Sequence, residues 1–292
     1  MRKNVRRQSK AKTRRVRESR TAPARRDADF VHGLAHGLRV LEAFDAQSAE
    51  ISLTEVARAA GLAPATARRS LHTLAALGYV RRASKQFVLS ARVLALGSAY
   101  LRLNGIEEVL LPELRAIVAR CGDTAGVAIL VDTEILYVAH YSEQRGVRAI
   151  AGTGVRYPAH PTSLGRALLS GLSRSELDAY FRAARLERYT ERTETDPRRL
   201  RAVIAEARRN GYATIVDELF YGVTSLAVPI VAPGGGVVAA LNTSGYSGQV
   251  TPDDLIKYRL PELRRAAARI ADLVGRSSAL LHALGSGSHQ SP

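Results

Sequence analysis

Residues 64–76, PATARRSLHTLAA, could recognise nucleic acid if they form a helix. Helical spacing places Ala67, Leu71 and Leu74 on one side, where they would pack inward. The other side carries two hydroxyls, one guanidinium and one imidazole: Thr66, Thr73, Arg69 and His72. Such side chains can hydrogen-bond base edges in a major groove. Most polar helix faces are merely solvated, so this face alone is a weak signal for DNA binding.

A second set of polar residues could bind a small molecule. Thr162 and Ser163 stand just before a predicted helix, whose free N–H groups would suit a carboxylate. The same hydroxyls could instead only cap that helix. Ser225 interrupts an apolar run, while Asn242 and Ser244 share one face of a predicted strand. Polar groups inside a sheet need partners, which can be a ligand, a buried network or water.

Other reactive side chains give weaker signals. Arg148 and Arg156 could neutralise a ligand carboxylate, although an ordinary surface role is the simpler interpretation. His140 and His160 have no second ligand at metal spacing, which favours structural roles and no metal site. Cys121 is the one cysteine and is interpreted as a core residue. Gly-x-Ser-x-Gly, His-Glu-x-x-His and Cys-x-x-Cys are absent, so we expect neither an enzyme nor a cofactor.

The segment around the polar helix predicts a winged helix-turn-helix. Ser52 and Glu55 have capping-box spacing, Gly61 ends that helix, and Pro64 suits the first turn of the next. Ala63 is a poor N-cap, which leaves the start of the second helix less well defined. The following GYVRRASKQFVLS predicts a short hairpin. Its cationic side chains near the tip could hold phosphates: Arg81, Arg82 and Lys85.

The whole chain of 292 residues divides into five predicted parts. A basic disordered tail (1–28) precedes the winged domain (29–90) and a linker helix (91–105). Alternating helices and strands then predict an α+β domain with an antiparallel sheet (106–278), and a flexible tail follows (279–292). The linker helix is apolar enough to pack against a partner chain or its own domains.

Charge is distributed unevenly along the chain. Residues 1–26 hold twelve Lys or Arg and one acid, and so carry most of the net charge of +16. With almost no apolar residues this segment should be disordered. It could be an arm that seeks phosphates, a solvated tail, or an extension from a wrongly chosen start codon. The segment also lacks the apolar stretch of a secretory signal, and no membrane span is evident, so a cytoplasmic protein is expected.

In this order along the chain, six segments resemble the IclR family of bacterial transcriptional regulators: GLRVLEAF, LTEVARAAGL, TARRSLHTLAALGYV, GVRYPAHPTSLGRALLS, GVTSLAVPI and VVAALNTSG. The segments DFVHGLAHGLRVLEAF and LDAYFRAARLERYTERTETDP are more similar to the PcaR/PobR-type branch, which regulates aromatic-acid catabolism.

The resemblance implies a winged helix that binds double-stranded operator DNA, and a GAF-like effector-binding domain. It also implies homodimers that often pair into tetramers. The DNA-facing helix would include Arg68, which the helical spacing places on the flank. The effector, a small carboxylate of the β-ketoadipate pathway type, would lie between the sheet and loops 152–165 and 216–225. The residues implied for it are Thr162, Ser163, Gly165, Asp217, Tyr221, Ser225, Asn242 and Ser244.

Two alternatives remain open at this stage. A regulator of an unrelated pathway would sense a different small molecule with the same architecture. A nonspecific basic DNA-binding protein would depend on the tail, although it would not need a large α+β domain. Ile215 and Phe220 favour an apolar or aromatic effector over a very small keto acid.

Overall fold

The computed structural model describes residues 29–44, 50–121, 123–143 and 151–285. The chain forms two compact units, Met1–Ser98 and Ala99–Pro292. The boundary falls inside helix α4 (Arg92–Leu103), which confirms a helix over most of the predicted linker. The predicted basic tail lies outside the described residues. So does the segment VRAI (147–150), whose composition predicts a short strand.

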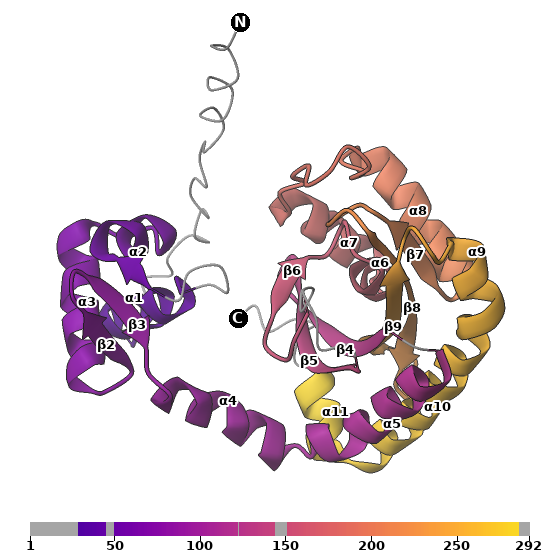
Figure 1. Cartoon of the computed structure of the whole chain (residues 1–292), viewed down its shortest axis with the longest axis horizontal. Helices are drawn as coiled ribbons and strands as arrows, with labels where there is room; N and C mark the ends of the chain where they lie inside the picture. The colour runs from indigo at the N-terminus through magenta and orange to yellow at the C-terminus, as the bar shows by residue number, and fades with distance from the viewer. Residues whose placement is uncertain (1–28, 45–49, 122, 144–150, 286–292) are drawn as a thin grey trace, which may run out of the picture. The chain divides into compact units, whose positions relative to one another are not determined.

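The N-terminal unit is a winged helix-turn-helix (Figure 1). Its elements, in chain order before α4, are α1 (His32–Glu42), β1 (Ile51–Ser52), α2 (Leu53–Ala59), α3 (Pro64–Ala76), β2 (Val80–Ala83) and β3 (Gln86–Leu89). Helices α1, α2 and α3 enclose a small core that includes Val40, Val56 and Leu71. Burial of these apolar side chains is the main force holding the three helices together.

Local sequence signals fix the start and end of these helices. Ser52 and Glu55 form the expected capping box at the start of α2. Gly61 follows α2 with a φ of 63°, which a residue with a side chain rarely adopts. Pro64 opens α3, and Ala63 supplies no side-chain cap, as predicted. The sequence therefore places the turn between α2 and α3 correctly.

The wing has one strand more than the sequence predicted. Strands β2 and β3 form the expected antiparallel hairpin, with Ser84 at its turn. The short strand β1 pairs with β3 on its other edge, so Ile51 lies opposite Phe87. A strand of two residues gives no periodic signal, and its pairing with β3 is what defines it.

The C-terminal unit is an α+β domain around an antiparallel sheet. The strands run in the order β6-β5-β4-β9-β8-β7 across the sheet. Their bounds are β4 (Thr124–Val131), β5 (Glu134–Ser142), β6 (Arg156–Pro158), β7 (Ala213–Val216), β8 (Val223–Val231) and β9 (Val237–Tyr246). The helices are α5 (Ile106–Cys121), α6 (Ser163–Leu169), α7 (Arg174–Ala183), α8 (Pro197–Asn210), α9 (Pro252–Asp254), α10 (Leu260–Arg276) and α11 (Ser278–Gly285).

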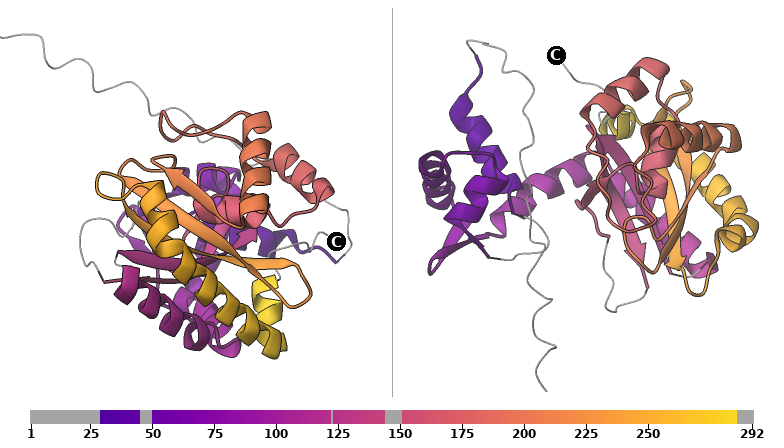
Figure 2. Two further views of the ribbon diagram at one scale, coloured as in Figure 1. Left: turned by 90° about the vertical axis from the view of Figure 1, so that its right-hand side faces the viewer. Right: turned by 90° about the horizontal axis from the view of Figure 1, so that it is seen from above.

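Helices cover both faces of the sheet (Figures 1 and 2). On one face, α5, α10 and α11 form a core with residues such as Leu114, Leu241 and Ile270. On the other face, α6, α7 and α8 pack through residues such as Leu164 and Ile204. Part of this second face borders a cavity.

Four expectations about the C-terminal unit are corrected. The segment 279–285 is not a flexible tail, because Leu280, Ala283 and Leu284 bury themselves as part of α11. The segment LPELRAIVARCG predicts a helix with Pro112 in its first turn, but α5 begins at Ile106 and Pro112 lies inside it. The loop read at 152–165 contains strand β6, which pairs with β5.

The fourth correction concerns residues 251–275, whose sequence predicts one long closing helix, because that helix is interrupted. A π-helical turn, Leu255–Arg259, joins α9 to α10. Pro261 directly follows the start of α10 and has no N–H to donate to the preceding turn, which widens there.

Candidate functional site

The outward face of α3 carries the predicted DNA-reading residues. Arg68, Arg69, His72 and Thr73 are exposed, and Thr66 is half-buried. The opposite side chains Ala67, Leu71 and Leu74 are buried, as the helical spacing predicted. The hydroxyl of Thr73 donates to the Arg69 carbonyl oxygen at 3.1 Å, so it is partly used within the helix.

The wing presents further positive charge. Arg81 and Arg82 are exposed on β2, and Lys85 is exposed in the turn. Arg82 donates to the Ser84 carbonyl oxygen at 3.0 Å, which orders its guanidinium beside the turn. Within the winged unit, α3 and the wing therefore offer uncharged hydroxyls, one imidazole and several cations, the combination that base edges and phosphates require.

A cavity of about 210 Å³ lies over the sheet face that α6 covers. A continuous row of paired residues crosses five strands along its floor: Ser142, Thr124, Ser244, Ser225 and Ile215. Paired residues of antiparallel strands point to the same face, so this row faces the cavity together. The next row toward the interior is His140, Gly126 and Asn242, and its two side chains also line the cavity.

Ser225 lies at the centre of a hydrogen-bond network in this floor. Its hydroxyl lies 2.7 Å from Ser163 Oγ, receives a hydrogen bond from Ser244 Oγ at 3.0 Å and another from Asn242 Nδ2 at 3.2 Å. Asn242 Nδ2 also donates to Ser244 Oγ at 3.2 Å. These four predicted residues therefore lie together, as a cluster of uncharged donors and acceptors.

Aromatic rings form the adjacent wall of the cavity. Tyr137 packs edge-on against both His140 and Tyr157, and Tyr157 packs edge-on against Phe220 at 5.5 Å between ring centroids. Burial, with a contribution from Tyr157, raises the pKa of Tyr137 even though Asn242 hydrogen-bonds it. Gly126 makes room for this ring, since a Cβ there would lie 2.7 Å from Tyr137 Cε1. The wall is suited to a flat, partly apolar ligand.

At the predicted helix start, the Thr162 hydroxyl is used mainly to cap helix α6. Thr162 Oγ1 accepts from the Gly165 N–H at 2.9 Å and donates to the Ala159 carbonyl oxygen at 3.1 Å. Thr162 lines the cavity, while Gly165 does not. Gly165 is instead required for packing, because a Cβ would lie 2.0 Å from the Ala159 oxygen.

Asp217 and Tyr221 also lie outside the cavity wall. Asp217 Oδ1 accepts from the Gly222 and Val223 N–H groups and from Ser247 Oγ. Tyr221 is exposed, and its hydroxyl accepts from the Glu191 N–H at 3.2 Å. Both residues shape the loop 217–222, whose Leu219 and Phe220 do line the cavity.

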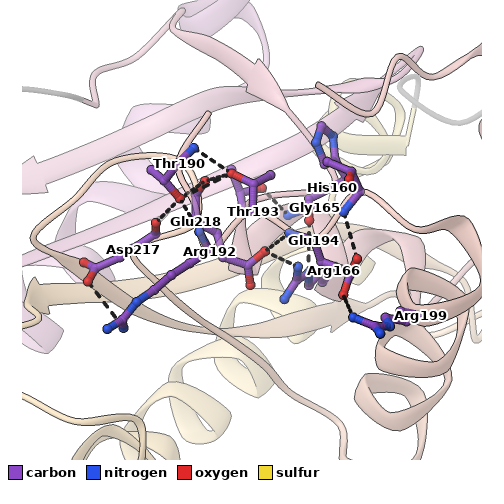
Figure 3. A network of polar contacts seen from close by, with 12 residues as sticks. His160, Gly165, Arg166, Thr190, Arg192, Thr193, Glu194, Arg199, Asp217 and Glu218 are labelled. Atoms are coloured by element: carbon purple, nitrogen blue, oxygen red, sulfur yellow. Dashed lines mark hydrogen bonds and ion pairs between the residues drawn. The ribbon is translucent and has the colours of Figure 1, made fainter. Parts of the chain in front are cut away.

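A polar network fastens that loop from outside the cavity (Figure 3). Thr190 Oγ1 donates to the Asp217 carbonyl oxygen and Thr193 Oγ1 to the Glu218 carbonyl oxygen, each at 2.6 Å. The Glu218 carboxylate accepts from Arg166 on α6 and from the Glu194 N–H. The segment 190–194 therefore holds the loop in place against the helix that borders the cavity.

The remaining candidates have other partners. Arg156 pairs with Glu134 at 2.8 Å on the surface, and Arg148 lies outside the described residues. His160 is buried with Nε2 3.0 Å from the Glu187 carbonyl oxygen, and burial lowers its pKa. Cys121 is half-buried at the end of α5, where burial raises its pKa. His140, expected to be structural, lines the cavity instead.

Comparison with known proteins identifies both units. A family model for the IclR helix-turn-helix domain matches residues 33–84, and one for the bacterial transcriptional regulator IclR C-terminal domain matches residues 98–272. The chain belongs to the IclR family of transcriptional regulators. As an IclR-family protein it is a DNA-binding regulator and not an enzyme. Among the described residues, no group of His, Cys, Asp and Glu could hold a metal ion, and no helix could cross a membrane.

Two characterised relatives share much of this IclR-family chain. The Pca regulon regulatory protein of Pseudomonas putida is 36% identical over 82% of this chain and 83% of its own length. The p-hydroxybenzoate hydroxylase transcriptional activator of Acinetobacter baylyi is 33% identical over 85% of this chain and 94% of its own. The chain is therefore close to the PcaR/PobR-type branch, as the sequence predicted.

A solved structure extends the comparison. An IclR homolog from Microbacterium hydrocarbonoxydans, complexed with 4-hydroxybenzoate, is 27% identical. It covers 85% of this chain and 99% of its own, with a TM-score of 0.65. The predicted combination of winged helix and effector-type domain is thus confirmed.

Proposed function

We propose that this regulator controls genes of aromatic-acid catabolism by binding a small aromatic carboxylate in its cavity. The observation that carries the proposal is the pairing of a hydroxyl and amide floor with a wall of aromatic rings. A benzoate ring would pack against Tyr157 and Phe220, and its polar substituents would meet Ser163, Ser225 and Ser244. Relatives of the PcaR/PobR-type branch and the 4-hydroxybenzoate complex of an IclR homolog support this ligand class.

DNA recognition is assigned to α3 and the wing. Arg69, His72 and the Thr66 hydroxyl would read base edges, and Arg68, Arg81, Arg82 and Lys85 would contact phosphates or bases nearby. The effector then acts through its different affinity for alternative arrangements of the regulator.

A homodimer is part of the proposal. Leu94, Leu96 and Leu103 on α4 are largely exposed, and a second copy of the chain would cover them. Two copies would also present two α3 helices to a pseudo-palindromic operator. Light scattering coupled to gel filtration should give twice the chain mass or a multiple of it; a monomer at micromolar concentration would contradict this part.

The test of the effector is a thermal-shift screen of the purified chain. The compounds are protocatechuate, 4-hydroxybenzoate, β-ketoadipate, cis,cis-muconate, pyruvate and glyoxylate. A ligand that binds the folded state alone raises Tm with concentration. A saturable shift from an aromatic acid supports the proposal. A shift from pyruvate or glyoxylate alone would instead indicate a different pathway.

Deleting residues 1–26 separates this proposal from nonspecific DNA binding driven by the basic tail. The deletion should lower affinity and its dependence on salt, because fewer counterions are released, while the preference for the operator is kept. Loss of all DNA binding on deletion would favour the nonspecific alternative.

A further inference from the structure

The floor of the cavity offers hydroxyls and an amide but little positive charge. Among the described wall residues there is no Lys or Arg. The two buried arginines of the effector domain are both engaged, Arg166 by Glu218 and Arg259 by Asp123 at 2.9 Å. A bound carboxylate needs a charged or hydrogen-bonding partner once it leaves water. No guanidinium or ammonium group of the described wall can therefore supply the positive charge that would balance the effector carboxylate.

His140 is the imidazole that this wall contributes. It lies on β5 opposite Gly126, which in turn lies opposite Asn242 on β9. His140 and Asn242 are therefore roughly 10 Å apart at two strand spacings, and the Tyr137 ring occupies the space over Gly126 between them. Its ring is half-buried and packs edge-on against Tyr137, with no hydrogen bond to any described residue.

Among the described residues, the arginines near His140 are already paired with acids, which leaves its imidazole as the group there that can take a carboxylate. Asp123, Tyr137, Tyr157 and Tyr246 are the other titratable groups of the described wall, and Asp123 is already paired with Arg259. From the neighbouring elements, Arg166 on α6 is paired with Glu218, and Arg156 on β6 is paired with Glu134. Helix α5 packs against the opposite face, where Arg115 lies over the ring of Tyr141.

We propose that His140, as the imidazolium, is the charge partner of the effector carboxylate and so selects acids over neutral aromatic compounds. This inference rests on the proposed effector class. It places the carboxylate at the β5 end of the cavity and the second polar substituent of the ring at the Ser163–Ser225–Ser244 cluster. A para-substituted ring would lie between the two ends.

Proton uptake on binding is a direct consequence. Burial lowers the pKa of His140 in the empty protein, so its imidazole is largely neutral at pH 7. A carboxylate next to it favours the protonated form and raises that pKa. The affinity for the carboxylate is then greatest below the pKa of His140 in the empty protein. Between that pKa and the higher pKa in the complex, the affinity falls by up to about tenfold per pH unit, because binding must take up a proton. A benzoate remains ionised throughout pH 6–8.5 and contributes no slope of its own.

The experiment compares two probes by isothermal titration: 4-hydroxybenzoate and its neutral isostere 4-hydroxybenzamide. The full chain, His140→Gln and the control His282→Gln, an exposed residue of α11, are titrated between pH 6 and 8.5. The wild type and the control should bind the acid more tightly at low pH, with an apparent enthalpy that depends on the ionisation enthalpy of the buffer. His140→Gln should lose about tenfold or more in affinity for the acid at pH 6, should lose the pH slope, and should bind the amide as the wild type does.

The outcomes separate the inference from the function that it rests on. If His140→Gln binds the acid with the same affinity and the same pH dependence as the wild type, the assignment of His140 is overturned and the proposed function stands. An equal loss of acid and amide would also overturn it, as a packing effect. If the wild type binds neither 4-hydroxybenzoate nor protocatechuate, the proposed effector class fails, and His140 with it. Unchanged operator binding by His140→Gln shows that the variant is folded.

Discussion

Arg166 and Glu218 form a buried ion pair, with Arg166 Nη2 lying 2.5 Å from Glu218 Oε2. The pair joins α6 to the loop 217–222, so it connects two of the elements that border the cavity. Arg166 also donates to the His160 carbonyl oxygen at 3.0 Å, and Glu218 accepts from the Glu194 N–H. Both side chains are almost fully shielded from solvent. The geometry of the cavity therefore depends on a charge pair that lies outside its described wall.

Replacing Glu218 by Ala should destabilise the effector domain by about 3–5 kcal/mol, because Arg166 is left as a buried charge without its partner. Urea unfolding followed by circular dichroism measures the change. The control Glu206→Ala removes an exposed carboxylate of α8 and should change stability little. Equal effects of the two substitutions would mean that the buried pair contributes nothing specific.

The parts of the fold that local signals encode were predicted from the sequence. The capping box at Ser52 and the proline at the start of α3 are examples, since each acts within one turn of helix. Two elements that depend on distant partners were missed. Strand β6 exists through its pairing with β5, and α11 through the burial of Leu280. Neither dependence is visible in the residues themselves.

The candidate site was predicted in the same partial way. Ser225 and Asn242 were found because polar residues interrupt otherwise apolar strands. His140 was interpreted as structural because it has no second ligand at metal spacing. A β-bulge also affects its strand, because the register of β4 and β5 shifts between Val127 and Ala128. Strict alternation would place Tyr137 and His140 on opposite faces, but the bulge at Val138 brings both to the cavity. A single sequence gives no sign of such a shift.

Asp217 should make the stability of the loop depend on pH. Burial opposes its ionisation, but hydrogen bonds from Ser247, Gly222 and Val223, together with Arg192, outweigh burial and lower its pKa. A lowered pKa stabilises the folded state above the unfolded value, about 3.9, and the stabilisation is lost as pH falls through the folded value. Asp217→Asn keeps a residue that tolerates the observed φ of 56° but removes the charge.

The Tm of Asp217→Asn should therefore lie below that of the wild type from pH 7 down to about pH 5, and the difference should shrink below about pH 4. Differential scanning calorimetry across that range measures it. Asp253→Asn, an exposed residue of α9, is the matched control and should show no comparable pattern. If the difference in Tm between Asp217→Asn and the wild type stays constant down to pH 3, the carboxylate charge is not the cause of that difference.

Ser225→Ala should weaken binding of the aromatic acid that the thermal-shift screen identifies. The hydroxyl is the shared partner of Ser163, Asn242 and Ser244, so its removal leaves buried polar groups unsatisfied and misplaced. The expected loss is about 1–3 kcal/mol of effector affinity. Calorimetric titration measures it, and Ser175→Ala, an exposed residue of α7, is the control. Operator binding without effector should be unchanged; an unchanged effector affinity would place the ligand elsewhere.

Arg69→Ala should weaken operator binding by about 1–3 kcal/mol if Arg69 makes a bidentate contact with a base. The residue is exposed at the centre of the α3 face, between Thr66 and His72, and no described acid of α3 competes for it. Fluorescence anisotropy with operator and random duplexes at fixed salt measures both affinities. Arg209→Ala, exposed on α8, controls for the loss of one positive charge. A base contact predicts a loss on the operator that exceeds the loss on random DNA. Equal losses on the two duplexes would instead mean that Arg69 contacts a phosphate, which fixes orientation and carries no sequence information.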